Sequence, residues 1–135
     1  MTRAEDRWWL IGGAACALHG FAGEIADIDV IMSVRDARQI LSDLGIAPEP
    51  QGRAGRFRSA TFGRWKGLPL QVDLMGGFEV HTGGDRIAVL PATREAIEIG
   101  GQRLYVPSRR ELASILRLFG RPKDIARARA LAAAF

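Results

Sequence analysis

The segment Asp27–Met32, with the sequence DIDVIM, constrains the fold of this chain more than any other segment. Acidic and apolar residues alternate at its start. Because strand side chains project to opposite faces with a period of two, Asp27 and Asp29 share one face, and Ile28 and Val30 share the other. The apolar face must cover a core, so the two carboxylates lie side by side on the opposite face. Their mutual repulsion predicts a divalent cation between them.

A second alternating strand adds a third acid. In the segment LPLQVDLM, at 68–75, the aliphatic residues Leu70, Val72 and Leu74 share one face. Asp73 therefore faces away from the aliphatic core and becomes a candidate third ligand. Hard oxygen donors of this kind suit Mg²⁺ or Mn²⁺, and such ions keep coordination positions free for substrate phosphates. The sequence therefore predicts a metal-bound nucleotide as a ligand.

A glycine pair precedes the acidic strand. The apolar run RWWLI ends at Gly12 and Gly13, and the small residues of AACALHGF follow. This order is typical of a strand, a glycine turn and a tightly packed helix. Glycine lets the backbone approach a phosphate closely, and the N–H groups of a helix start attract anions. We predict that Gly12 and Gly13 hold the phosphates of the nucleotide.

The remaining pattern predicts a mixed fold. Capping-box pairs predict helices after Ser33 and after Ser108, and a proline predicts the start of a last helix at Pro122. The alternating runs at 56–62 and 68–75 predict a hairpin. These elements favour an α+β (α/β-like) fold, in which a small mixed sheet of about 4–6 strands carries helices packed mainly on one face.

Composition limits the class of protein. The chain has 135 residues, of which 47% are hydrophobic, so we expect a single domain over 1–135 with a helical C-terminal segment at 108–135. The lone Cys16 cannot form an internal disulfide, which favours a cytoplasmic location. The apolar N-terminal run is too short to span a bilayer, so we expect no membrane insertion. His and Cys have no zinc-binding spacing, and no Ser–His–Asp grouping can be singled out.

Positive charge is concentrated near the C-terminus. The formal net charge is +4, and 103–129 contains eight Lys or Arg residues but only two acids. Such a region suits a polyanionic ligand such as a nucleic acid, although a solvated basic helix face is the simpler explanation of this charge taken alone.

Taken together, the motifs resemble those of the nucleotidyltransferase superfamily with a DNA polymerase β-like fold. The resemblance consists of Gly-Gly after a strand, thirteen intervening residues, DIDV, and an isolated Asp in LQVDLM. The tail FGRPKDIARARAL, at 119–131, resembles the GRPKD segment of minimal nucleotidyltransferases related to abortive-infection toxins (AbiEii-type). The resemblance covers 9–131.

This resemblance implies an Mg²⁺- or Mn²⁺-dependent enzyme of the EC 2.7.7 type. Such an enzyme moves a nucleoside monophosphate from a nucleoside triphosphate, ATP among them, to a hydroxyl acceptor on RNA such as tRNA, on a protein or on a small molecule. The resemblance also implies a toxin of a toxin–antitoxin system, with an antitoxin partner. It implies catalytic and metal-binding roles for Asp27, Asp29 and Asp73, and it implies that Gly12 and Gly13 hold the triphosphate. Three cations near the GRPKD segment, Arg117, Arg121 and Lys123, are further candidates for nucleotide binding, although the start of a solvated helix explains Arg121 and Lys123 equally well.

Two departures from the family pattern motivate alternatives. The segment GEIA before Asp27 lacks the Thr or Ser that the family often has there, and Leu116 stands where a Lys is common. One alternative is a catalytically inactive module of the same fold that binds a nucleotide or RNA. The other is a basic RNA-binding domain whose acids are structural.

Overall fold

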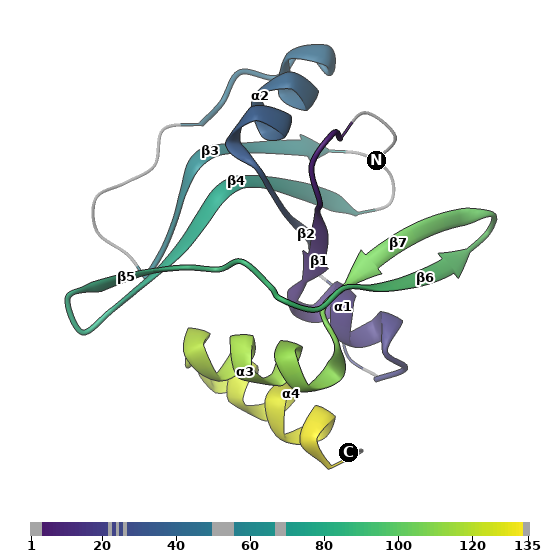
Figure 1. The fold of residues 1–135 in the computed structure, drawn as a ribbon, viewed down its shortest axis with the longest axis vertical. Helices are drawn as coiled ribbons and strands as arrows, with labels where there is room; N and C mark the ends of the chain where they lie inside the picture. Colours follow the sequence, from purple (N-terminus) through teal and green to yellow (C-terminus); the bar gives the residue numbers. More distant parts are fainter. Residues whose placement is uncertain are drawn as a thin grey trace.

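The computed structural model describes residues 4–21, 23, 25, 27–49, 56–66 and 70–133 (Figure 1). The elements are β1 (Trp9–Ile11), α1 (Gly12–Leu18), β2 (Asp27–Met32), α2 (Val34–Asp43), β3 (Phe57–Lys66), β4 (Gln71–Thr82), β5 (Asp85–Ala88), β6 (Glu95–Ile99), β7 (Gln102–Val106), α3 (Arg109–Phe119) and α4 (Pro122–Ala132). The α+β class is confirmed. The polar sequence PEPQGRAG at 48–55 predicts a loop, and most of it lies outside the described residues.

The main sheet has five strands and is mixed, as predicted. Its order is β1-β2-β4-β3, and β5 pairs with the far end of β4. The strands β2 and β4 are parallel, whereas β1, β3 and β5 pair antiparallel to their neighbours. A parallel pair needs a crossover, and α2 lies in the connection between β2 and β4. The strands β6 and β7 form a separate two-stranded sheet that projects from the body (Figure 1).

The register of β2 and β4 sets what each face of the sheet carries. Asp29 stands opposite Asp73, and the next pair is Val30 opposite Leu74. Because successive side chains alternate, the acids lie on one face and the buried aliphatic residues on the other. A single register therefore builds the core on one side of these strands and gathers the acids on the other.

Helices cover both faces unequally. On the aliphatic face, α2 packs closely enough that a Cβ added to Gly76 would lie 2.7 Å from Cβ of Ala37. On the acid-bearing face, the Phe119 ring of α3 lies 5.1 Å from Phe57 and 5.9 Å from Phe78. Figure 1 shows α1, α3 and α4 gathered together, apart from α2. Most helices therefore lie on one side of the sheet, as expected.

The start of α2 confirms one of the predicted capping residues and adds an anchor. Ser33 Oγ accepts a hydrogen bond from the backbone N–H of Asp36 at 3.1 Å. The buried carboxylate of Asp36 accepts bonds from the backbone N–H groups of Glu5 at 3.1 Å and Asp6 at 2.7 Å. Asp36 thus fixes the N-terminal segment against α2, and its charge is satisfied by backbone donors.

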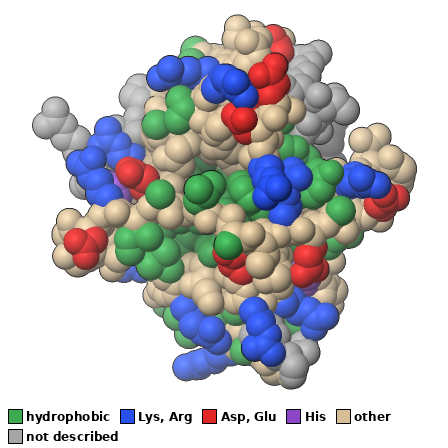
Figure 2. All heavy atoms as spheres, viewed as in Figure 1, with side chains coloured by type: hydrophobic (Ala, Val, Ile, Leu, Met, Phe, Trp, Pro, Cys, Tyr) green, Lys and Arg blue, Asp and Glu red, His purple; other side chains and the backbone are tan. Residues whose placement is uncertain are grey.

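The positive surface charge lies near the C-terminus, where the sequence concentrates Lys and Arg. Lys and Arg side chains gather over α3 and α4 at the lower end of the molecule, and hydrophobic side chains gather across the middle of the same view (Figure 2). Within the described ranges, no helix is long and apolar enough to cross a membrane.

Gly63 of β3 packs so closely beneath α2 that a methyl group has no room. A Cβ on Gly63 would overlap Cδ2 of the buried Leu41 and lie 2.8 Å from its Cδ1. We expect Gly63→Ala to lower the free energy of unfolding by about 1–3 kcal/mol, as overpacked cores do. In a Leu41→Ala background the methyl group gains space, so the same change should cost much less. Urea unfolding of the four proteins measures this coupling, and equal costs in both backgrounds would contradict it.

Candidate active site

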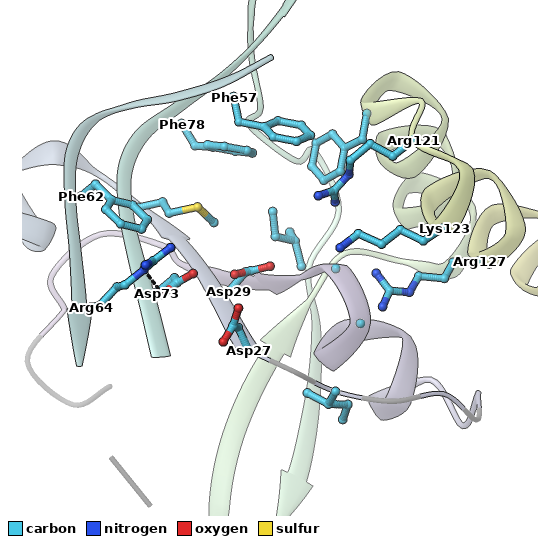
Figure 3. Close-up of a pocket in the computed structure, with 16 residues that line it drawn as sticks. Asp27, Asp29, Phe57, Phe62, Arg64, Asp73, Phe78, Arg121, Lys123 and Arg127 are labelled. Carbon is cyan, nitrogen blue, oxygen red and sulfur yellow. Dashed lines mark ion pairs between the residues drawn. The ribbon is translucent and has the colours of Figure 1, made fainter. Parts of the chain in front are cut away.

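A pocket of about 310 Å³ lies on the acid-bearing face of the sheet. The carboxylates lie on the strands, and most of the cationic side chains come from the start of α4 and face them across the pocket (Figure 3). It is lined by Ile11, Gly12, Gly13, Ile25, Asp27, Asp29, Phe57, Phe62, Arg64, Asp73, Met75, Phe78, Phe119, Arg121, Lys123 and Arg127.

The structure brings the three predicted acids into this one pocket. Asp27 and Asp29 come from β2, and Asp73 comes from the neighbouring parallel strand β4. In Figure 3 the carboxylate of Asp29 lies between the other two acids and the α4 cations. Residues that are 44 positions apart in sequence, Asp29 and Asp73, are thus direct neighbours across the sheet.

Both predicted glycines line the pocket. Gly12 is the first residue of α1, so the expected separate glycine turn is part of the helix itself. Gly12 has a φ of 68°, which glycine adopts without strain. A Cβ at this position would lie 3.1 Å from Oδ2 of Asp29. A side chain at Gly12 would therefore crowd the carboxylate, and glycine keeps the space beside Asp29 open.

Asp29 has a strongly perturbed carboxyl group. Burial, and after it the charges of Asp73 and Asp27, raise its pKa to about 6. Arg121 and Lys123 oppose this rise. The side chain is thus a carboxylate whose charge is poorly compensated by the protein, a state that a bound cation would relieve.

Asp73 is buried, with 7% of its surface exposed, and its burial raises its pKa. Two neighbours oppose this rise through the same oxygen. Gln71 Nε2 donates a hydrogen bond to Oδ1 at 3.0 Å, and Nε of Arg64 lies 3.4 Å from Oδ1. Among the described residues, Oδ2 of Asp73 is therefore the oxygen that stays available to a ligand.

The donor set is that of a hard cation. The lining residues offer three carboxylates and no His or Cys, which suits Mg²⁺ or Mn²⁺. The described part of the chain contains no ready-formed group of three Asp, Glu, His or Cys side chains that would hold a metal ion. Asp27 and Asp29, together with the glycine-lined space beside them, fit such an ion best.

Three cations face the acids across the pocket: Arg121 at the N-cap of α4, and Lys123 and Arg127 within the helix. Arg121 is fixed by the fully buried Asp124 through contacts of 2.6 and 3.0 Å, and its guanidinium lies 4.7 Å from the Phe57 ring centroid. Lys123 and Arg127 line the pocket without an ion pair to another described residue. These two side chains are thus the cations best placed to bind an anionic ligand.

The structure does not bring the predicted Arg117 to the pocket. Arg117 is exposed on α3, because this helix turns Leu116 and Phe119 inward and Arg117 falls on the opposite side. Sequence reasoning missed Arg127, although its spacing of four residues from Lys123 places both on one face of α4.

Two further features were not singled out from the sequence. Phe57, Phe62 and Phe78 form an apolar wall of the pocket, and Arg64 stands at its edge over Phe62. The sequence offers one signal for Arg64: if the two strands form a hairpin, Arg64 pairs with Asp73 across it, as the structure shows.

Comparison with solved structures identifies the fold. No protein-family model and no curated protein matches the chain. A protein of Thermotoga maritima assigned to the nucleotidyltransferases superposes with a TM-score of 0.74 at 18% identity, covering 100% of this chain and 87% of that one. The antibiotic-resistance factor ANT(2'')-Ia gives a TM-score of 0.56 at 14% identity, with 96% and 75% covered. The lincosamide adenylyltransferase LnuA with bound lincomycin gives 0.54 at 15% identity, with 94% and 88% covered. The chain has the nucleotidyltransferase fold.

The carboxyl group of Asp29 is expected to destabilise the fold at neutral pH. Its pKa of about 6 exceeds the roughly 3.9 of an unfolded Asp, so between these values the folded state binds more protons. Stability therefore falls as the pH rises from about 4 to 6. Without divalent cations, Asp29→Asn should be more stable than the wild type by about 1–2 kcal/mol at pH 7.5, the shift being discounted because solvent reaches the side chain.

At pH 4 this gain should vanish, because the wild-type carboxyl is then protonated in the fold. Urea unfolding at pH 4 and at pH 7.5 measures the difference in stability between Asp29→Asn and the wild type. Asp85→Asn, which changes an exposed acid on β5, is the matched control and should show no such pH dependence. A gain for Asp29→Asn that is equal at both pH values would contradict the prediction.

Proposed function

We propose that this protein is a metal-dependent nucleotidyltransferase that moves a nucleoside monophosphate from a nucleoside triphosphate to a hydroxyl acceptor. The observation that carries the proposal is the pairing of three carboxylates with the α4 cations across one pocket. The fold supports it, because solved structures with this fold include nucleotidyltransferases.

The triphosphate would bind between the acids and α4. Lys123 and Arg127 point into the pocket and supply charged donors to the phosphates, and Arg121 adds a fixed guanidinium. The backbone at Gly12 and Gly13 lets phosphate oxygens approach closely. Each of these groups serves binding and orientation.

The carboxylates would carry the chemistry. Asp27 and Asp29 would hold Mg²⁺ or Mn²⁺, with Asp73 as the third carboxylate. A bound cation lowers the pKa of an attacking hydroxyl and offsets the charge that develops on the leaving pyrophosphate. In the transfer, a bond forms between the acceptor oxygen and the α-phosphorus, and the bond from this phosphorus to the β-phosphate bridging oxygen breaks. The hydroxyl proton would pass to Oδ2 of Asp73.

Three classes of hydroxyl acceptor fit the proposal. ANT(2'')-Ia is known in complex with adenylyl-2''-tobramycin and LnuA with lincomycin, so small molecules are candidate acceptors here. The positive charge over α3 and α4 favours RNA, such as tRNA, and a protein is a further candidate. A toxin role of the AbiEii type and an antitoxin partner stay predictions that rest on the sequence resemblance. A cytoplasmic location stays a prediction that rests on the lone Cys16.

Transfer of label tests the proposed activity. The purified protein is incubated with Mg²⁺ and each α-³²P-labelled nucleoside triphosphate, with total RNA, protein or small hydroxyl compounds as acceptors. We expect label in one acceptor class, and a loss of about 100-fold or more in Asp27→Asn and Asp29→Asn, the scale for removing one charge-stabilising group. Asp85→Asn is the control and should keep full activity.

Two other outcomes are informative. Cation-dependent nucleotide binding in calorimetry without transfer to any acceptor would favour the catalytically inactive alternative. Failure of the wild type to bind any nucleoside triphosphate in the presence of Mg²⁺ would refute the proposal.

Lys123 and Arg127, the α4 cations without an ion pair to another described residue, should set the affinity for the nucleotide. Removing a charged hydrogen bond costs about 1.5–3 kcal/mol, so Lys123→Gln and Arg127→Gln should each raise the nucleotide Kd by about tenfold or more. Arg117→Gln removes the same charge from the outer face of α3 and should leave the Kd within about twofold. Isothermal titration calorimetry with a non-hydrolysable ATP analogue and Mg²⁺ measures all three. A loss in Arg117→Gln as large as that in Arg127→Gln would show that overall charge, rather than the pocket, binds the nucleotide.

A further inference from the structure

The two ends of the pocket differ in chemistry. In Figure 3, Arg121, Lys123 and Arg127 lie on one side of Asp29, and Asp73 lies on the other side. Under the proposed function, on which this inference rests, the triphosphate occupies the α4 side. The acceptor hydroxyl must then approach from the side of Asp73.

Arg64 is the lining cation on the Asp73 side of the pocket. It lies on β3 directly opposite Asp73, and its Nε is 3.4 Å from Oδ1 of that carboxylate. Its guanidinium carbon lies 5.4 Å from the ring centroid of Phe62, the preceding pocket-facing residue of the strand. The carboxylate and the ring together fix the guanidinium plane at the rim of the pocket.

The guanidinium of Arg64 keeps donors for a ligand. An arginine has five N–H donors, and the ion pair to Asp73 uses Nε. The side chain is 47% exposed, so its terminal nitrogens reach solvent at the mouth of the pocket. A planar pair of N–H donors matches the oxygens of a phosphate group better than any other common anion-binding side chain does.

Several charges act at the Asp73 end of the pocket. Asp27 and Asp73 line the pocket, and the exposed Glu49 also raises the pKa of Asp73. Arg64 is the lining cation that pairs with Asp73. The acids would repel an anion at the mouth of the pocket unless the anion bound the N–H groups of Arg64 that Asp73 does not use, so Arg64 is the lining residue on this side that can hold one.

We propose that Arg64 determines the acceptor: it binds a phosphate group of the acceptor while the acceptor hydroxyl faces Asp73, and Phe62 supports the body of the molecule. The acceptor class is thus a hydroxyl compound that carries a phosphate close to the reacting hydroxyl. Both a nucleic-acid phosphodiester and a sugar phosphate have this chemistry.

Paired probes with and without a charged phosphate group test the assignment. The first pair is the dinucleotide CpA and its methylphosphonate analogue, which has the same hydroxyl groups but an uncharged linkage. The second pair is glucose 6-phosphate and glucose. Calorimetry measures their binding with and without saturating Mg²⁺ and a non-hydrolysable ATP analogue. In the wild type, the charged member of one pair should bind at least about tenfold tighter than the neutral member, and that pair identifies the phosphate source.

The variants assign the preference to one residue. Arg64→Gln should abolish the difference between the charged and neutral probes, and Arg64→Lys should keep part of it. Arg58→Gln is the matched control, because Arg58 lies on the same strand opposite Glu79 and outside this pocket. It should leave the preference unchanged, as should Glu49→Gln.

Several results would overturn the inference. These are equal binding of both members of each pair, no binding of either charged probe, or a preference that survives in Arg64→Gln. Failure of the wild type to bind the ATP analogue is a separate result, and it would count against the proposed function. The preference for the charged probe is also measured without the analogue, so the two outcomes can be distinguished.

Discussion

The parallel pairing of β2 with β4 is the constraint on which the rest of this structure depends. Its register sets Asp29 opposite Asp73, two acids that the chain keeps far apart in sequence. A slip of one residue between the two strands would put an acid of one strand on the same face as the aliphatic residues of the other, so burial of Val30 and Leu74 fixes the register. Burial of the aliphatic face thereby offsets the electrostatic repulsion between the acids on the other face. Helix α2, which supplies the crossover, is accordingly part of what positions the acids.

The cations are arranged as a response to this concentration of negative charge. At the α4 side, the buried Asp124 fixes Arg121, and the uncommitted cations lie beside it on the same helix. At the other side, Arg64 contacts Asp73 directly. Even so, burial and the neighbouring acids hold the pKa of Asp29 at about 6, so the cations compensate its charge only in part. Functional sites commonly break a rule that the rest of a fold obeys, here the compensation of buried charge.

Much of the fold could be predicted because alternation and capping are local signals. The strand at Asp27–Met32 and the capping residue Ser33 are where the sequence puts them. The strand β5 could not be predicted, because all of its residues are exposed and it has no alternating burial. Arg64 and Arg127 were missed for a different reason: their roles depend on a strand partner and on a helix face, neither of which a motif records. Arg117 was expected at the site from its proximity in sequence, but it lies on the outer side of α3.

Two buried acids of this chain, Asp36 and Asp124, differ in their partners from the half-buried Asp27 and Asp29. Asp36 accepts two backbone N–H bonds, and Asp124 is held by a bidentate arginine. Both show what a structural carboxylate looks like in this fold, with its charge fully hydrogen-bonded inside the protein. Asp27 and Asp29 have neither kind of partner, since they make no hydrogen bond or ion pair to another described residue. Two adjacent acids left unpaired beside a glycine that keeps space open are what a site for an external cation requires, and a structural role would have no use for that space.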